Sequence, residues 1–444
     1  MQMRKNVLCA LTALACVSFS ARAQKVEFTE YDMPNGLHVI LHADHHAPVV
    51  AVSVMYHVGS KNEVAGRTGF AHFFEHLLFE GSDNIKRGQF MKIVSANGGS
   101  NNANTTQDRT FYYEVFPSNY LETGLWLESE RMMHPVINDI GVKTQDEVVK
   151  EERRQSFDNR PYGNFINVVA RDLFASHPYH NGVIGEMKDI DAAKLEEFKE
   201  FFKQYYVPDN AVLTIAGDID PEKTKALINA YFGPIPAGPA VVYHKTEEAP
   251  ISKPIIDTAY DANIQIPLIV EALRVPGRDT RDAKVMQMIS SILSSGGSSR
   301  LYKKMVDEKK DALQVLAFNY SLEDYGMYII GALPNNGAAP AALLKDVNEE
   351  IVKLQTDLIS QGDYEKLENQ MEDNYVNANS RQLGIAENLA NGYTFYHKDT
   401  NELNGELAVF KSITREEIRD AAKKYLDANQ RLELYYLPGK AKAK

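Results

Sequence analysis

The sequence predicts an α+β fold in which one domain occurs twice. The chain has 444 residues, which is more than one hydrophobic core of ordinary size encloses. Residues 196–205 and 416–425 share a pattern, in which two glutamates and an apolar residue are followed at the same interval by a tyrosine. In both places the predicted helix leads to an asparagine and then to an apolar strand. A repeat of this length is too long for a solenoid and indicates two copies of one domain.

Prolines mark the connection between the two copies. They are frequent from residue 234 to residue 254, and this composition is typical of a linker. We therefore expect a first domain over residues 24–235, a linker over 236–254 and a second domain over 255–444.

The N-terminus has the pattern of a secretory signal peptide. Two basic residues precede an apolar run over residues 7–19, and Ala21-Arg22-Ala23 forms a small-x-small cleavage site. The apolar run is shorter than a membrane anchor requires. Both cysteines, Cys9 and Cys16, lie inside this segment, so the mature chain has no disulfide and no cysteine ligand. We expect an exported protein, in the periplasm or secreted.

Charge and hydropathy narrow the class of partner. The formal net charge of −12 argues against nucleic acids and anionic membranes, which bind basic patches. No apolar run after the signal peptide is long enough to span a bilayer. Peptides that are cationic or neutral suit such a surface better.

Periodicity predicts the elements of the first domain. Strands at Val26–Met33 and Leu37–Leu41 flank Pro34-Asn35-Gly36, which is a hairpin turn because Asn-Gly accepts positive φ. Further strands are predicted at 49–57, 100–106, 110–116 and 211–216, and helices at 89–96, 121–132, 142–156 and 193–206. In the second domain we predict helices at 285–293 and 338–358 and a strand at 313–320.

Residues 69–79 carry the clearest chemistry. Their apolar side chains recur at helical spacing, and 3.6 residues per turn place His72 and His76 on one face with Glu75 beside them. Two imidazoles spaced in this way can hold Zn²⁺ at two of its tetrahedral positions, and the carboxylate can take a proton from a water at the metal. The alternative is an ordinary amphipathic helix. However, a helix lined with Phe and Leu would bury three polar side chains without a partner, which costs free energy.

The helix predicted at 142–156 carries three glutamates that could supply a third ligand. Glu147 and Glu151 belong to a charged i, i+4 pattern, which predicts a solvated face. Glu152 instead lies above the two valines that precede it by three and four residues, which predicts the buried side.

The order His-x-x-Glu-His over residues 72–76 is the inverted zinc signature, and with it the sequence resembles the pitrilysin or insulinase family of zinc metallopeptidases. The resemblance is to the shorter-chain branch related to the mitochondrial processing peptidase, and it is most specific from residue 59 to residue 185. It implies Glu152 as the third ligand, because the family's ligand ends a Val-x-x-Glu run. It also implies two homologous α/β sandwich domains with mixed, largely antiparallel sheets, forming half of a clam shell.

The resemblance further implies where substrate binds. Family members add an extended substrate to an edge strand at the position of Asn102 and Ala103. The alternative is that Asn102 only closes a turn.

Two parts of the sequence depart from the family pattern. Gln145 stands where many members carry a second acid, which would orient a metal ligand. Asp307 and Gln314 align with an Arg and a Tyr that bind the substrate carbonyl in many relatives, and an Asp cannot stabilise an oxyanion. We therefore expect a related second subunit that carries the Arg-Tyr pair, in a heterodimer. A homodimer, or a monomer in which zinc alone polarises the carbonyl, is the alternative.

The second domain offers no second metal site. Its counterpart of the zinc helix is the stretch 285–293, where Gln287, Ser290 and Ser291 occupy the ligand and base positions. None of these residues would hold zinc well, so we expect one Zn²⁺ per chain.

Together these patterns predict a zinc metalloendopeptidase. His72, His76 and Glu152 would bind the metal, and Glu75 would remove a proton from water and pass it to the leaving amine. The competing class is a binding or assembly subunit of the same fold that has lost catalysis, and measured zinc content would separate the two.

Overall fold

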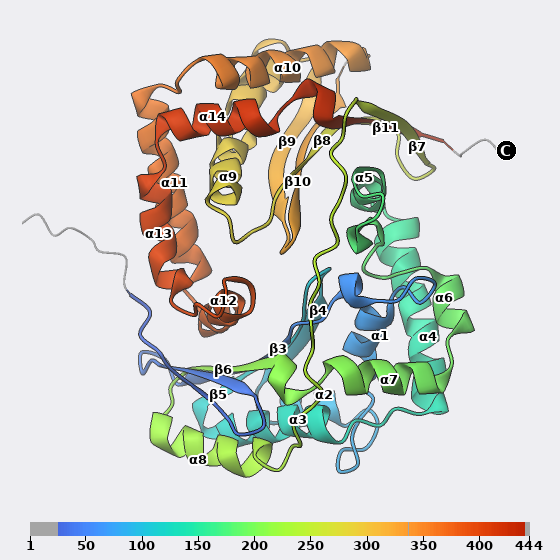
Figure 1. Cartoon of the computed structure of the whole chain (residues 1–444), viewed down its shortest axis with the longest axis vertical. Coiled ribbons are helices and arrows are strands. Elements are labelled where there is room, and N and C mark those ends of the chain that lie inside the picture. The colour runs from blue at the N-terminus through green and yellow to red at the C-terminus, as the bar shows by residue number, and fades with distance from the viewer. Residues whose placement is uncertain (1–24, 336, 440–444) are drawn as a thin grey trace, which may run out of the picture.

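The computed structural model describes residues 25–335 and 337–439, so the predicted signal peptide lies outside the described residues. Two mixed sheets form the centre of the molecule (Figure 1). The first sheet contains β1 (Thr29–Asp32), β2 (His38–Ala43), β3 (Val49–Tyr56), β4 (Ser100–Thr105), β5 (Thr110–Pro117) and β6 (Ala211–Gly217). The second contains β7 (Ile255–Asp261), β8 (Leu268–Pro276), β9 (Ala312–Ser321), β10 (Tyr325–Pro334) and β11 (Arg431–Pro438).

Fourteen helices of the described chain surround these sheets. In the first half they are α1 (Phe70–Leu77), α2 (Phe90–Ala96), α3 (Leu121–Met133), α4 (Asp139–Arg153), α5 (Phe165–Leu173), α6 (Met187–Ala192), α7 (Leu195–Tyr205) and α8 (Pro221–Phe232). In the second half they are α9 (Arg281–Ser294), α10 (Pro340–Thr356), α11 (Gln361–Ala378), α12 (Gln382–Phe395), α13 (Glu402–Ser412) and α14 (Arg415–Tyr425).

Both sheets follow the same chain path, which confirms the predicted duplication. The strand orders are β1-β2-β6-β3-β5-β4 and β7-β11-β8-β10-β9. In each sheet, the strand that comes last in the sequence pairs in parallel with one neighbour: β6 with β2, and β11 with β7. The other described strand pairs are antiparallel. The helices α7 and α14, which carry the repeated sequence pattern, lead directly into these two strands.

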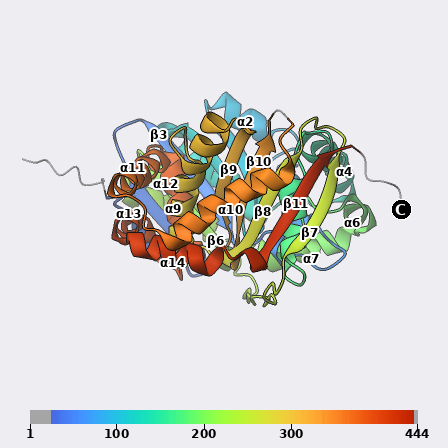
Figure 2. The ribbon, with the colours of Figure 1, turned by 90° about the horizontal axis from the view of Figure 1, so that it is seen from above.

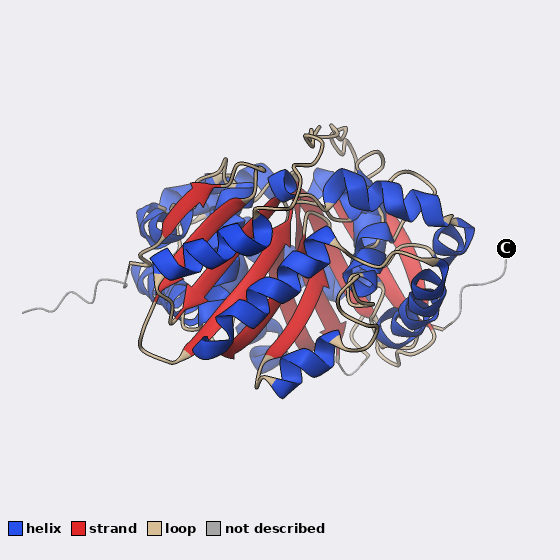
Figure 3. Ribbon diagram, turned by 90° about the horizontal axis from the view of Figure 1, so that it is seen from below, coloured by secondary structure: helices blue, strands red, loops and turns tan. Residues whose placement is uncertain are grey.

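The central strand β3 shows why the first sheet needs cover on both faces. Its sequence Val-Val-Ala-Val-Ser-Val-Met-Tyr is almost continuously apolar, as in strands that are buried on both sides. Val50, Val52 and Val54 face the core that includes α1, α3, α7 and α8. Ala51 and Met55 face the opposite side. Figure 3 shows helices lying across the strands on the outer side of this sheet.

The other face of each sheet is covered by a helix from the other half of the chain. Ile385, Leu389 and Phe395 of α12 pack on the first sheet beside β3 and β6. Reciprocally, Val169 and Leu173 of α5 pack on β8 and β11 of the second sheet. Figure 1 shows α12 above the first sheet and α5 beside the second, and Figure 2 shows α10 and α14 across the second sheet's outer face.

The connection between the halves has no helix or strand over residues 236–254. The predicted boundaries of the two domains stay a prediction. The halves are not packed separately, because α5 of the first half packs on the second sheet and α12 of the second half packs on the first sheet. Among the described residues, no helix combines the length and apolarity needed to span a bilayer.

Most predicted elements lie within a few residues of the observed ones. The helix predicted at 142–156 begins earlier, at Asp139, because the side chain of Asn138 caps it by accepting a hydrogen bond from the backbone N–H of Gly141 at 2.9 Å.

Candidate active site

Helix α1 begins at a glycine that no other residue could replace without strain. Gly69 has φ of 90°, and a Cβ there would lie 2.7 Å from the carbonyl oxygen of Ile184. Phe70 and Phe74 point into the core, where they stack on Phe198 and Phe201 of α7. The opposite face of α1 therefore presents its polar residues toward α4.

The N-terminus of α1 is capped from outside the helix. The carboxylate of Glu63 accepts hydrogen bonds from the backbone N–H groups of Gly69 and Ala71, at 2.8 and 2.9 Å. These donors have no partner within the helix, and the carboxylate also complements the helix dipole.

We expect Glu63→Ala to lower the free energy of unfolding by about 1–2 kcal/mol, because two backbone donors lose their acceptor. Urea unfolding of the zinc-loaded protein measures the change. Glu196→Ala is the control, since Glu196 lies in the first turn of α7 and pairs on the surface with Lys199. Equal effects of the two variants would contradict the capping role.

Helices α1 and α4 bring three metal-ligating groups together, as the sequence predicted. The Nε2 atom of His76 lies 3.0 Å from one oxygen of Glu152, and the Nε2 atom of His72 lies 3.5 Å from the other. One ligand atom from each residue lies within 4.8 Å of the other two. The imidazoles of His72 and His76 hold the pKa of the Glu152 carboxyl well below its usual range.

This donor set fits Zn²⁺. Two imidazole nitrogens and one carboxylate oxygen on one side leave a tetrahedral position open, which is the arrangement of catalytic zinc sites. The Nδ1 atom of His72 is buried and has no hydrogen-bond partner among the described residues. A ligating histidine usually donates this second N–H to an acceptor, so His72 lacks the usual support.

The prediction that Glu152 lies above two buried valines is wrong. Val148 is 43% exposed, so it does not mark a buried face of α4. Val149 is buried. Glu152 is partly exposed and is directed by its contacts with the two histidines.

Glu75 has a partner that the sequence analysis did not identify. The Thr105 hydroxyl, at the end of β4, donates a hydrogen bond to Glu75 Oε2 at 2.7 Å. Side chains of a strand alternate between its two faces, so Thr105 lies on the same face as Ala103. This alternation is the sequence feature that could have indicated Thr105. The bond holds the Glu75 carboxylate against the end of β4.

Strand β4 lies at the edge of the first sheet, next to β5 only among the described strands. Asn102 is exposed and Ala103 is buried, so the strand has one solvent-facing side chain at this point. The outer edge of β4 carries backbone groups with no strand beside them, which is where an added strand would bind.

Gln145 contacts an acid rather than a metal ligand. Its side-chain amide donates to Glu80 Oε1 at 2.5 Å, and the buried Glu80 also pairs with Arg87. Glu80 lies three residues beyond the end of α1, so Gln145 joins α4 to the segment that follows α1.

We expect Gln145→Glu to lower the free energy of unfolding by about 1–3 kcal/mol, because it places a second carboxylate against Glu80 and removes a hydrogen bond. Like charges raise the pKa of such a pair, so the loss should be larger at pH 8 than at pH 5. The double variant Glu80→Gln/Gln145→Glu restores the donor and acceptor in exchanged positions. Urea unfolding that shows no recovery in the double variant would contradict this account.

The two residues that align with the family's Arg-Tyr pair are exposed. Asp307 lies in a π-helical turn, Tyr302–Glu308, and Gln314 lies on the edge strand β9. On α9, the counterpart of α1, Ser290 donates to the Met286 carbonyl within its own helix, and Gln287 is exposed. Among the described residues, the metal-ligand cluster of α1 and α4 has no equivalent in the second half.

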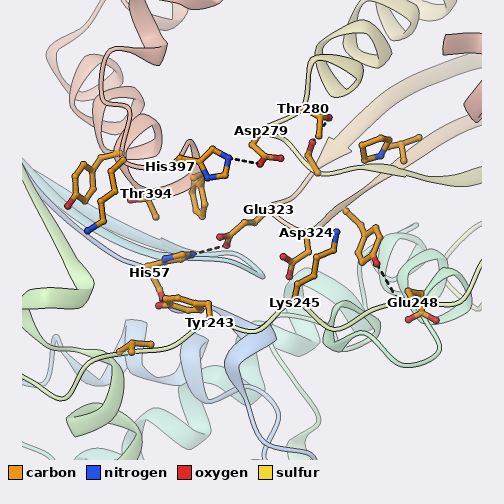
Figure 4. A pocket seen from close by; sticks show the side chains of 18 of the residues that line it. His57, Tyr243, Lys245, Glu248, Asp279, Thr280, Glu323, Asp324, Thr394 and His397 are labelled. Carbon is orange, nitrogen blue, oxygen red and sulfur yellow. Dashed lines mark hydrogen bonds and ion pairs between the residues drawn. The ribbon is translucent and has the colours of Figure 1, made fainter. Parts of the chain in front are cut away.

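A cavity of about 880 Å³ lies elsewhere, between the two sheets and the connection that joins them. His57, Tyr243 and Glu323 line it, and none of the three metal-ligating residues does (Figure 4). His57 stacks on Tyr243 and its Nε2 lies 2.8 Å from Glu323. The cavity is therefore separate from the candidate metal centre.

Comparison with known proteins places the chain in a family. A family model described as Insulinase (Peptidase family M16) matches residues 38–186, and one described as Peptidase M16 inactive domain matches residues 192–371. The zinc protease PqqE of Helicobacter pylori is 31% identical over 357 residues, covering 79% of this chain and 80% of that protein. This chain belongs to peptidase family M16. The resemblance to the insulinase family is confirmed.

Solved structures agree with the M16 fold. A protease from Helicobacter pylori has a TM-score of 0.88 at 27% identity, covering 93% of this chain and 100% of that one. The periplasmic protease PqqL of Escherichia coli has a TM-score of 0.77 at 17% identity, and the match covers 95% of this chain and 48% of PqqL. The predicted two-domain α+β fold is confirmed.

Proposed function

We propose that this M16 chain is an exported zinc-dependent endopeptidase that hydrolyses peptides or small unfolded polypeptides. The observation that supports it best is the convergence of His72 and His76 of α1 with Glu152 of α4. Glu75 lies on α1 between the two histidines. Relatives named zinc proteases make this chemistry the natural one for such a site. Export rests on the sequence of residues 1–23.

Each residue has a separate role in this proposal. His72, His76 and Glu152 hold one Zn²⁺ per chain. Bound zinc would polarise the peptide carbonyl and lower the pKa of a water at the open position. Glu75, held by Thr105, accepts a proton from the attacking water and then delivers it to the leaving amine.

The edge of β4 would bind the substrate as an additional strand. Main-chain hydrogen bonds would then align the scissile peptide, and the exposed Asn102 and the adjacent Ala103 would contact its side chains. Since β4 also carries Thr105, substrate and Glu75 are positioned by one strand.

We also propose that a related second subunit supplies the carbonyl-binding Arg and Tyr in a heterodimer. Asp307, at the position that aligns with the Arg, cannot stabilise a developing oxyanion. A homodimer, or a chain that acts alone, is the alternative.

The test is cleavage of a mixed peptide pool by the purified, zinc-loaded mature chain, followed by mass spectrometry and repeated after chelation. Zinc-dependent cutting would support a self-sufficient peptidase and contradict the requirement for a partner. Stoichiometric zinc without cutting would favour the partner. Absence of bound zinc would contradict the enzyme and favour a non-catalytic binding or assembly subunit.

A further inference from the structure

The turn between β4 and β5 is held by the second half of the chain. Of the four residues between Thr105 and the start of β5, three are each bonded to a residue more than 200 positions later. These contacts join Gln107 to Tyr320, Asp108 to Glu323 and Arg109 to Glu387.

Asp108 is the centre of this arrangement. It is fully buried, and it accepts hydrogen bonds from the Glu323 backbone N–H at 2.9 Å and the Tyr179 hydroxyl at 2.5 Å. The Lys61 ammonium lies 3.1 Å from the same carboxylate. A buried carboxylate with this many partners fixes the groups around it, since losing any of them leaves a charge poorly compensated.

Glu323 links the turn to the cavity between the sheets. Its backbone binds Asp108, and its side chain pairs with Lys61 and His57. Figure 4 shows Glu323 reaching from the second half of the chain toward His57 of the first. The connection is therefore made of both backbone and side-chain groups.

Arg109 and Gln107 add a contact on either side of Asp108. The buried Arg109 pairs with Glu387 of α12 and also donates to Asn104 on β4 at 2.7 Å. The Tyr320 hydroxyl at the end of β9 donates to Gln107 at 3.2 Å. The neighbour of Asn104 on β4 is Thr105, which binds the Glu75 carboxylate.

We propose that the second domain positions the catalytic base through this turn, and that Asp108 and Arg109 are positioning residues for Glu75. The proposal rests on the proposed function and gives a role to a domain that has no metal-ligand cluster among its described residues. A catalytic group must be held to well under 1 Å, and a displacement of that size far from the reacting atoms can cost about 10²-fold in rate.

The test uses Glu387→Gln and Tyr320→Phe in the full, zinc-loaded chain. The first removes the negative charge that pairs with Arg109, the second removes the hydroxyl that donates to Gln107, and both leave the buried Asp108 intact. The matched controls are Glu402→Gln, which breaks the ion pair with Lys284 inside the second half, and Tyr364→Phe, which removes a hydroxyl bonded to Ile413. Asp108→Asn is the strongest variant. We measure kcat, KM, zinc content, thermal stability and amide hydrogen exchange of residues 100–110.

We expect about a tenfold lower kcat for Glu387→Gln, with KM within about twofold, zinc content unchanged and faster exchange over residues 100–110. The controls should change neither kcat nor exchange in that segment. Faster exchange with unchanged kcat, or unchanged exchange, would overturn the proposal. If the wild type binds zinc and cuts nothing, the chain requires the proposed partner, and exchange alone decides whether the second domain holds the turn. If the wild type binds no zinc, the proposed function fails, and this too is distinguished by exchange, which does not depend on activity.

Discussion

Glu75→Gln is expected to lower kcat by roughly 10³-fold while zinc content and stability stay at the wild-type level. The amide keeps the size of the side chain and still accepts a hydrogen bond from Thr105, but it cannot take a proton. Glu75 is not among the three converging ligand groups, so the metal should remain. Peptide cleavage followed by mass spectrometry, beside metal analysis of the same sample, measures both quantities.

Two further variants make this result specific. Thr105→Val removes the hydroxyl that orients Glu75, and we expect a smaller loss than for Glu75→Gln. Glu151→Gln changes an exposed acid near the end of α4 and should have no effect. Cleavage by Glu75→Gln at the wild-type rate would show that another group is the base.

Replacing Glu152 with Ala is expected to remove zinc altogether. Its two carboxylate oxygens lie 3.5 Å from the Nε2 atom of His72 and 3.0 Å from that of His76. Without them only two nitrogen ligands remain, which is fewer than the three that catalytic zinc sites use. Zinc content after dialysis should fall from about one per chain to near zero, and activity should fall with it.

Glu147→Ala is the control for Glu152→Ala, because Glu147 lies on the same helix and its side chain is 71% exposed. It should retain zinc and activity. Zinc binding by the wild type should also weaken as the pH is lowered, because protons compete with the metal for its ligands. Zinc retention by Glu152→Ala would contradict the assigned ligand set.

The proximity of the two histidines proposed as ligands could be predicted because their geometry is local. His72, Glu75 and His76 share one short helix, so the helical period fixes their relative directions. Glu152 comes from another helix. The prediction of a buried face at Val148 was wrong, while the family pattern selected the glutamate that lies beside the two histidines. Sequence spacing gives directions within a helix but not the packing of two helices.

The other contacts around the site join residues that are far apart in the sequence, and no periodic pattern in the sequence indicates them. The capping of α1 by Glu63, the bond from Gln145 to Glu80 and the contacts at Asp108 each join groups from different elements. Polar residues in these places resemble ordinary surface or loop residues in the sequence. The duplication was predictable because it repeats a pattern, whereas the exchange of α5 and α12 depends on how the two copies pack.

Each half of the chain covers one sheet face of the other half, through α5 and α12, and this has a consequence for folding during synthesis. When the first sheet has left the ribosome, the face beside Ala51 and Met55 has no cover, because α12 is still to be made. An apolar sheet face open to water at that stage invites association with other chains. We therefore expect the first half to complete its folding only after α12 has been made, and neither half to be obtainable alone as a stable, monomeric fragment.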